Sequence, residues 1–495
     1  MNHLSYHELF IISKYFDSIK DYINLVKTNK ECSNIINLFN YNPIPINNKN
    51  ERKLFKNITE YHIYEKSLRK SPPNIAVNHI VYWPQIKLSD IIPCNSITYK
   101  HIIFDDIDIV PVSKINKWLD KCDSLNKNLF SKIELDSITI PNNITYIDLE
   151  CFGYNTYLTS IILPSSLTSI PDKCCEYCLN LEYIKLPENL LSIEKFAFNK
   201  CLNLKKINIP DTITLIDYLA FQKCTSLSKI HFPKNLQLLN NSFYNCLNLE
   251  EIDFSKCNNL NEIRGFINCF KLSTIKLNNN INIIASHCFE NCSNLREIDL
   301  KEYTNLRLIH GCVFENCISL SKISLSNNIV RIDDDCFVNC SNLSNIQLPT
   351  NLTYLGINCF KMCINLKEIL IPNNITEIND GCFEECNSLT NIQLPMNLNY
   401  LGTNCFKNCS NLSNIILPDR IRRIKDFAFM DCVNLKEIKL PLEISQIGKN
   451  CFKNCSNLTK MEIPNTNFKY TIVKDECCEN CSENLEFVLY DMIDK

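Results

Sequence analysis

The fold is decided by the stretch Cys336-Phe337-Val338-Asn339-Cys340-Ser341-Asn342-Leu343-Ser344-Asn345-Ile346-Gln347-Leu348-Pro349, because near-copies of it recur along most of the chain. Phe337 belongs to a column of fifteen residues that repeats about every 23 positions. The column comprises Phe152, Cys175, Phe198, Phe221, Phe243, Phe266, Phe289, Phe314, Phe337, Phe360, Phe383, Phe406, Phe429, Phe452 and Cys478. A period of this length is typical of proteins that stack one small structural unit many times.

Each unit contains two extended segments and a turn. In the unit quoted above, the apolar residues from Leu343 to Leu348 predict a first strand, and Pro349 ends it because proline has no N–H for a ladder. Leu352 and Leu355 predict a second extended segment, and Gly356 is expected to open the turn. One unit cannot bury its own leucine, isoleucine and phenylalanine side chains, so neighbouring units must stack at about 4.8 Å.

The repeat resembles a known family. Ile193-Glu194-Lys195-Phe196-Ala197-Phe198-Asn199-Lys200-Cys201-Leu202-Asn203-Leu204 and the stretch from Ile424 to Leu435 are similar to the BspA-like leucine-rich repeat. The resemblance implies a β-rich repeat solenoid, namely a curved right-handed leucine-rich-repeat superhelix with a parallel β-sheet on one face. Members of this family are described as surface or secreted adhesins of microbes, so the resemblance also implies a cell-surface adhesin as one possible function.

We expect three regions along the chain. Residues 1–42 carry apolar residues at spacings of about three and four, which predicts a short α-helical N-terminal region. Residues 43–117 are irregular, with β-type stretches at 61–64, 79–82 and 99–104 that suggest divergent early repeats, aligned through Ile63, Ile80 and Ile102. Residues 118–490 form the regular solenoid of about 15 units.

The N-terminal region has two interpretations. Its motif residues are Leu4, Glu8, Leu9, Ile12, Tyr15, Phe16, Asp21, Tyr22, Leu25, Val26, Lys30, Ile35 and Ile36. They resemble an F-box, which implies a Skp1-like adaptor as a partner and a substrate receptor of a ubiquitin ligase as the function. Ser5 and Cys32 depart from that motif, because the family usually has proline and tryptophan there. The alternative is a helical cap that covers the apolar end of the first repeat.

Composition excludes several classes of protein. The formal net charge is only -3, so the chain as a whole does not favour nucleic acid. No apolar run approaches the roughly 18 residues that a membrane span needs. The N-terminus has no basic segment followed by an apolar one, so we expect a cytoplasmic protein, with the cell surface by a leaderless route as the alternative. The 30 cysteines are then expected to be reduced.

The cysteines recur in a C-x3-C spacing, as in Cys336 and Cys340, which could in principle form zinc sites. However, Ala197, Ala428 and Ser242 occupy the position before the column in other units, and a metal ligand would not be replaced by alanine. We therefore predict no metal and no cofactor, and assign the repeat residues to a buried core. The predicted core residues are Phe198, Phe221, Phe289, Phe337, Phe360, Phe383, Phe406, Phe429, Phe452, Cys340, Cys363, Cys386 and Cys409.

No sequence signature of catalysis occurs. The chain lacks the HExxH, G-x-S-x-G and P-loop motifs, which favours a protein that is not an enzyme. The acidic run Asp333-Asp334-Asp335 is not repeated and is interpreted as a solvated turn rather than a calcium site. His287 and His310 are interpreted as turn residues.

A partner would contact the outward positions of the first strands, because side chains alternate along a strand. Deviations from the repeat cluster at residues 250–325, which suggests a binding region there together with the charged positions just before it. The predicted function is a non-catalytic protein–protein interaction scaffold. The candidate partner-binding residues are Lys205, Lys206, Asn208, Lys229, His231, Glu250, Glu251, Asp253, Arg296, Glu297 and Asp299.

Overall fold

The computed structural model describes residues 115–465 and 477–490 throughout. Upstream of them it describes residues 13, 16, 18–28, 32–39, 41–45, 53, 55, 60–64, 79–82, 86–87, 97–99 and 102–104. The chain forms two compact units, of which the first comprises Met1–Phe130 and Ile140–Cys151 and the second comprises Ser131–Thr139 and Phe152–Lys495. The domain boundaries at residues 42 and 117 stay predictions.

The first unit contains the described helices, which are α2 (Ile19–Thr28), α3 (Cys32–Ile35), the 3-10 helix η1 (Ile36–Leu38) and α5 (Ile115–Leu119). At the start of helix α2, the Asp21 carboxylate reaches back to Ser18, which is one half of a capping box. The Ser18 hydroxyl donates to Asp21 Oδ2 at 2.7 Å, and the same oxygen accepts the Ser18 N–H at 3.2 Å. This arrangement satisfies groups that a helix start leaves unpaired. No helix among the described residues is both long and apolar enough to cross a membrane.

An aromatic cluster holds these helices together. The Tyr22 side chain is fully buried, and its ring meets those of Phe16, Phe55 and Phe39 edge to face at centroid distances of 5.0, 5.2 and 6.0 Å. Tyr22 is therefore a core residue of this unit. Several residues of the F-box resemblance lie outside the described part of the chain, namely Leu4, Glu8, Leu9, Ile12, Tyr15 and Lys30.

The strands of the first unit are β1 (Glu60–Ile63), β2 (His79–Tyr82), β3 (Ile86–Lys87), β4 (Ile97–Tyr99), β5 (Ile102–Phe104), β6 (Ser124–Leu125) and β8 (Tyr146–Ile147). They form two parallel sheets, in the orders β1-β2-β4 and β3-β5-β6-β8. Ile80 pairs with Tyr61 and Ile97, so the predicted alignment of Ile80 with Ile63 and Ile102 is wrong. The early coils differ in length, and a constant spacing therefore does not locate their partners.

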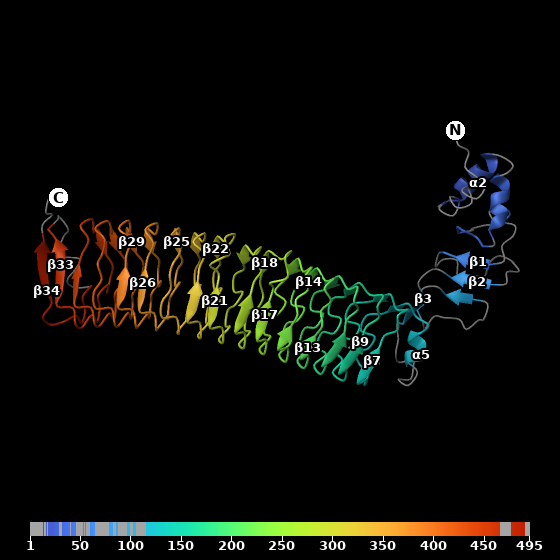
Figure 1. Ribbon diagram of the computed structural model, residues 1–495, viewed down its shortest axis with the longest axis horizontal. Helices are drawn as coiled ribbons and strands as arrows, with labels where there is room; N and C mark the ends of the chain where they lie inside the picture. Colours follow the sequence, from blue (N-terminus) through green and yellow to red (C-terminus); the bar gives the residue numbers. More distant parts are fainter. Residues whose placement is uncertain are drawn as a thin grey trace. The chain divides into compact units, whose positions relative to one another are not determined.

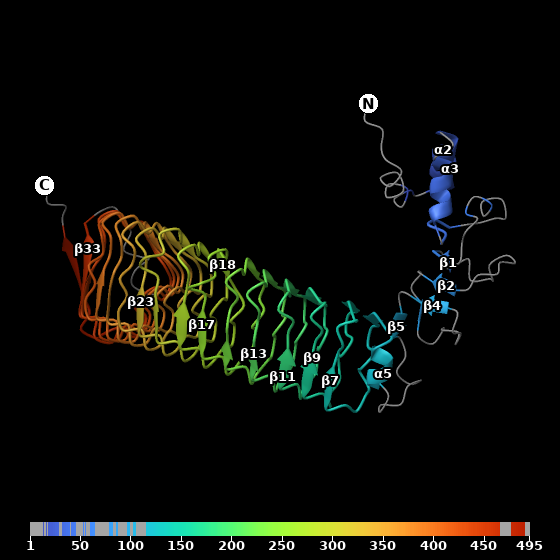
Figure 2. The same ribbon diagram turned by 45° about the vertical axis from the view of Figure 1, so that its right-hand side comes forward.

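The second unit is a solenoid in which most regular coils carry two strands (Figures 1 and 2). The first segments at 343–348 and 412–417 form no strand, so the first strand predicted from Leu343 to Leu348 is wrong. That segment makes only an isolated parallel bridge, between Asn345 and Glu368. The first strands of the coils are β7 (Ser137–Thr139), β9 (Ser160–Ile162), β11 (Tyr183–Lys185), β13 (Lys206–Ile207), β15 (Lys229–Ile230), β17 (Glu251–Asp253), β19 (Thr274–Lys276), β21 (Glu297–Asp299), β23 (Lys322–Ser324), β26 (Glu368–Leu370), β28 (Asn391–Gln393), β31 (Glu437–Lys439), β33 (Lys460–Pro464) and β34 (Glu486–Tyr490).

The second strands are shorter. They are β10 (Ser169–Ile170), β12 (Ser192–Ile193), β14 (Leu215–Ile216), β16 (Leu238–Leu239), β18 (Glu262–Ile263), β20 (Ile283–Ile284), β22 (Leu308–Ile309), β24 (Arg331–Ile332), β25 (Tyr354–Leu355), β27 (Glu377–Ile378), β29 (Tyr400–Leu401), β30 (Arg423–Ile424) and β32 (Gln446–Ile447). In Figure 1, β13, β17 and β21 follow the lower side of the solenoid, whereas β14, β18 and β22 follow its upper side.

The pairings between these strands are parallel and join equivalent positions of neighbouring coils, as in Ile184 with Ile161. A β-rich repeat solenoid with parallel sheets is therefore confirmed. The resemblance implied a sheet on one face, but both extended segments form strands in most coils, as Glu368–Leu370 and Glu377–Ile378 do. Most three-residue first strands turn their middle residue inward: Ile298 is buried between exposed Glu297 and Asp299. This alternation gives the solenoid an outward surface of first-strand side chains, here called the first-strand face.

The third side of each coil is a turn that carries the column. From Phe198 to Phe452 the column rings stack in parallel, with centroids 5.2–6.0 Å apart and interplanar angles of 2–21°. Every predicted core phenylalanine and cysteine has 0% of its surface exposed. The continuous core predicted for stacked units is thus present along this side.

Left-handed residues shape the turn. In the unit of Phe337, Asp335 and Asn339 have φ values of 57° and 56°. Gly356 is not left-handed; a Cβ there would lie 2.3 Å from the carbonyl carbon of Asp333 in the preceding coil. Gly356 stands between β25 and the turn that begins at residue 357, as the sequence predicts. Glycine is needed because two backbones approach closely at this point, and the left-handed residue is Asn358, with φ 51°.

Candidate functional site

The cysteine three residues after the column is a hydrogen-bond donor. In every unit from Cys178 to Cys481 its thiol donates to the carbonyl oxygen of the column residue one coil earlier, at S···O distances of 3.0–3.5 Å. In the first unit Asn155 replaces this cysteine, and its Nδ2 donates to the Ile133 carbonyl at 3.0 Å. These thiols therefore join neighbouring coils. The sequence indicates this role, because the position is cysteine or asparagine in every unit and never alanine.

From Cys174 to Cys481 the cysteines are free thiols. Burial raises the pKa of Cys363 to about 12 and raises that of Cys340 well above its ordinary range. These two thiols are fully buried as well as protonated near neutral pH, so solvent and metal ions do not reach them, and they are poor nucleophiles and metal ligands. Among the described residues, none of the C-x3-C pairs belongs to a cluster with metal-binding geometry.

The acidic run is engaged within the solenoid. Asp333 forms ion pairs with Arg331 and with His310, the latter at 3.8 Å. Asp334 Oδ1 accepts the N–H of Ile357 at 2.8 Å, and Asp335 Oδ1 accepts Asn358 Nδ2 at 3.1 Å. These carboxylates position the turn of the next coil, which agrees with their interpretation as turn residues.

All eleven predicted binding residues are exposed. Some are paired along the face: Lys205 with Glu182 at 3.2 Å, and Asp253 with Lys276 at 3.5 Å. Such exposed pairs contribute little to stability, so these side chains remain available to a partner.

Six of the predicted residues gather around one depression, here called the charged hollow, with a volume of about 410 Å³. They are Lys206, Asn208, Lys229, His231, Glu251 and Asp253, and Phe232 and Lys256 also line it. Lys205 and Glu250 stand next to this set in the chain. Arg296, Glu297 and Asp299 belong to the coil of β21 and do not line the hollow.

The charged hollow has a basic and an acidic side. Lys206 and Lys229 are register partners on β13 and β15, whereas Glu251 and Asp253 lie on β17, the first strand of the next coil. Asp211 stands nearby, 3.3 Å from Lys234 Nζ and 3.8 Å from His231 Nε2. The N–H and the ammonium of Lys234 both hydrogen-bond to Asp211 and lower the pKa of its carboxyl group. The hollow therefore carries separated charges of both signs.

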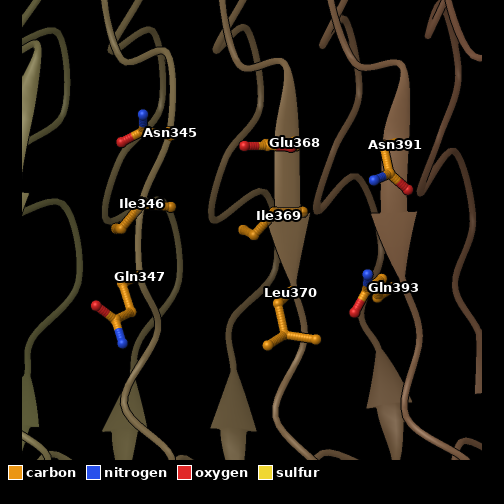
Figure 3. A pocket seen from close by; sticks show the side chains of 8 residues that line it. All are labelled: Asn345, Ile346, Gln347, Glu368, Ile369, Leu370, Asn391 and Gln393. Atoms are coloured by element: carbon orange, nitrogen blue, oxygen red, sulfur yellow. The ribbon is translucent and has the colours of Figure 1, made fainter.

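A second part of the first-strand face lies outside the eleven candidate residues, although the sequence predicts that outward positions such as Asn345 and Gln347 are exposed. Figure 3 shows a depression of about 340 Å³ where Asn345, Glu368, Leu370 and Asn391 project from neighbouring coils. A depression of about 590 Å³ continues it along the next coils and includes Met396 and Ile416. Leu370, Met396 and Ile416 are 62%, 71% and 80% exposed. We call these two depressions the apolar hollow. Reading each outward position down the repeat could have found Leu370 and Ile416, because Gln347 and Gln393 stand at the equivalent position in other units.

Comparison with known proteins identifies relatives of the repeat region. The model of the BspA type leucine rich repeat region matches residues 112–193, 168–265, 262–390 and 376–493. A leucine-rich repeat protein of Bacteroides ovatus is 25% identical over 75% of this chain and 88% of that chain, with a TM-score of 0.58.

Two further solved structures are more distant. A leucine-rich repeat protein of Eubacterium ventriosum is 18% identical over 61% of this chain and 84% of that chain, with a TM-score of 0.40. A leucine rich cell surface protein of Faecalibacterium prausnitzii is 19% identical over 75% of this chain and 91% of that chain, with a TM-score of 0.31. A comparison with curated proteins gives no match.

Proposed function

This chain belongs to the BspA type leucine rich repeat family, and from that premise we propose that it is a non-catalytic scaffold that binds a protein partner on its first-strand face. The observation that carries the proposal is the charged hollow. Inward positions repeat from coil to coil because they build the core, whereas the outward positions change and bring Lys206, Lys229, Glu251 and Asp253 around one depression. A surface of variable side chains on a uniform scaffold is how repeat proteins obtain specificity.

The charges of the hollow indicate which charged groups the partner should carry. Two lysines on β13 and β15 favour a carboxylate or a cluster of acidic side chains, and the acidic pair on β17 favours lysine or arginine beside it. Complementary charges act mainly on specificity and on the rate of association. Binding should therefore weaken as the salt concentration rises.

The test is affinity capture with the full chain as bait, followed by mass spectrometry. The charge-reversal variant Glu250→Lys/Glu251→Lys should lose specific partners that the native chain retains. Glu377→Lys is the matched control, because Glu377 is an exposed acid on β27 among the second strands. A double variant that captures the same proteins in the same amounts would sink the proposal.

We further propose a cytoplasmic location for this scaffold. The support is chemical: the buried thiols of successive coils are free and donate hydrogen bonds between coils, which disulfide formation would break. Labelling of intact cells with a membrane-impermeant reagent tests the location. Strong labelling would favour a surface adhesin instead.

The F-box-like interpretation of residues 1–42 is tested in the same capture experiment. A Skp1-like adaptor that disappears when residues 1–42 are deleted would favour a ubiquitin-ligase receptor. Capture of the other partners by the deleted chain, without any adaptor in either sample, is the result expected for a scaffold.

A further inference from the structure

Four side chains with metal-binding chemistry meet at the turns of two neighbouring coils. His287 and Glu290 follow β20, and Cys312 and Glu315 follow β22 in the next coil. Ligand atoms of His287, Cys312 and Glu315 all lie within 4.8 Å of one another. His287 is exposed and the other two are half-buried, so a solvated cation can reach all three.

Cys312 departs from the repeat. In other units the small residue before the column is cysteine, alanine, serine or glycine, and where it is cysteine its side chain points into the core. Here Val313 takes that buried position, and cysteine stands one residue earlier, with φ 58° and a partly exposed side chain. No other unit has cysteine at this position. Core packing therefore does not account for Cys312.

The carboxylates at this place also differ from their equivalents. Glu384 occupies the same turn position as Glu290 and Glu315, and it is paired with Lys361 at 2.9 Å and Lys407 at 3.5 Å. Among the described residues, no lysine or arginine forms an ion pair with Glu290 or Glu315. Glu290, Glu315 and the Cys312 thiol thus surround His287 without a lysine or arginine partner for the two acids in the described part of the chain. A divalent cation would neutralise the negative charge of the two carboxylates.

Glu290 orients the histidine. Its Oε2 lies 2.7 Å from His287 Nδ1. Because a carboxylate accepts, Nδ1 carries the proton of the neutral ring and Nε2 carries the lone pair. A carboxylate behind the imidazole is the usual support of a metal-binding histidine, since it fixes the tautomer and the ring orientation.

We propose that His287, Cys312 and Glu315 bind a zinc-type divalent cation, with Glu290 as the positioning residue for His287. One nitrogen, one sulfur and one oxygen ligand suit zinc, whereas calcium and magnesium prefer oxygen ligands alone. Three protein ligands leave one tetrahedral position for water or for a side chain of a partner. The cation joins two coils whose column residues, Phe289 and Phe314, are separated by 25 residues instead of 23.

The experiment uses the full chain, stripped with a chelator and titrated with Zn²⁺ against a chromophoric competitor. One tight site is expected. Cys312→Ser and His287→Gln should each weaken Zn²⁺ binding by more than about 100-fold, and Glu290→Gln by about 10–100-fold, as for the loss of an orienting carboxylate. His310→Gln and Glu384→Gln are the matched controls and should bind Zn²⁺ like the native chain.

Cobalt provides a readout that does not depend on affinity. Co²⁺ in the native site should show a thiolate charge-transfer band, which Cys312→Ser abolishes and Glu384→Gln retains. The absence of a tight site, or tight binding that survives both Cys312→Ser and His287→Gln, would overturn the proposal. Circular dichroism of each variant verifies that the solenoid is intact.

Discussion

Two cysteine positions in each unit look alike in sequence and differ in what their side chains contact. Cys409 donates to the carbonyl of Phe383 at 3.2 Å, whereas the thiol of Cys405 makes only a long contact of 4.0 Å to the carbonyl oxygen of Ala428. Both side chains are fully buried. The repeat itself replaces the Cys405 position by alanine in other units and never does so at the Cys409 position. The hydrogen bond explains that difference.

Cys409→Ala should therefore destabilise the protein more than Cys405→Ala. The Phe383 carbonyl keeps the Cys386 N–H as a donor at 3.2 Å, so the loss is that of one ordinary hydrogen bond. We expect an additional cost of about 0.5–1.5 kcal/mol in the free energy of unfolding. Urea denaturation of the two variants measures it. Equal midpoints would contradict a role for the thiol as a donor.

Buried thiols also predict how stability depends on pH. Burial raises the pKa of Cys363 from 9.0 to about 12, so between these values the folded chain holds a proton that the unfolded chain has lost. Stability is complete below about pH 9 and falls as the pH rises, by up to about 1.4 kcal/mol per pH unit for each such thiol. Urea midpoints at successive pH values from neutral to about 10 measure this slope.

The matched variant for this measurement replaces Cys336, Cys359, Cys382 and Cys405 by alanine. Burial raises the pKa of each of these thiols. The variant should lose less stability at alkaline pH than the native chain. The same slope in both proteins would show that these thiols are not responsible.

At the scale of elements, the strands are too short to be stable alone, and the column stabilises them. Second strands such as β14 and β18 contain two residues each. The stacked rings contribute a continuous apolar row beside them: Phe337 and Phe360 are 5.3 Å apart with nearly parallel planes. Burial of large aromatic side chains supplies far more stabilisation than the few ladder hydrogen bonds of one coil.

Phe337→Ala should cost about 3–5 kcal/mol, because it leaves a cavity between two stacked rings. The damage should stay local, since coils couple mainly to their neighbours. Hydrogen exchange should show lost protection in the coils around Phe314 and Phe360, with little change near Phe198. Leu370→Ala is the control: its side chain is 62% exposed, and we expect less than about 0.5 kcal/mol. Uniform loss of protection would argue against nearest-neighbour coupling.

The C-terminal end of the solenoid differs from its middle. β33 (Lys460–Pro464) pairs with β34 (Glu486–Tyr490) over five residues, and these are longer than the other first strands. β34 is the last strand of its sheet, and it covers the backbone edge of β33. Unlike β34, β33 carries buried apolar side chains, Met461 and Ile463, next to its edge, and an uncovered apolar edge is a template for association with other chains.

A chain that ends after Asn465 should therefore associate. Its first strands would end at β33, whose backbone groups would then be unpaired on one side. Light scattering or size-exclusion chromatography should detect oligomers, while a chain lacking only residues 491–495 should behave like the native protein. A truncated chain that stays monomeric would show that β34 is dispensable as a cap.

At the scale of the whole molecule, the protein consists of two units with different regularity. In the second unit most coils are related to the next by a spacing of 23 residues, so a single rule predicts most of its strands. In the first unit the steps between paired strands vary, and the prediction of partners from spacing failed at Ile63 and Ile102. Strand pairing can therefore be predicted from the sequence where the repeat is regular, and not where the coils differ in length.

The sequence by itself determined the repeat, the solenoid class, the buried column and the outward positions of the first strands. Those features follow from the repeat along the chain and from the alternation of side chains within one strand, both of which can be read without knowing which residues meet in space. Only the tertiary structure decided which outward side chains gather in the charged and apolar hollows, which carbonyl each thiol reaches, and that His287 and Cys312 meet. These contacts join residues of different coils, and their partners depend on the register of stacking, which a one-dimensional pattern does not contain.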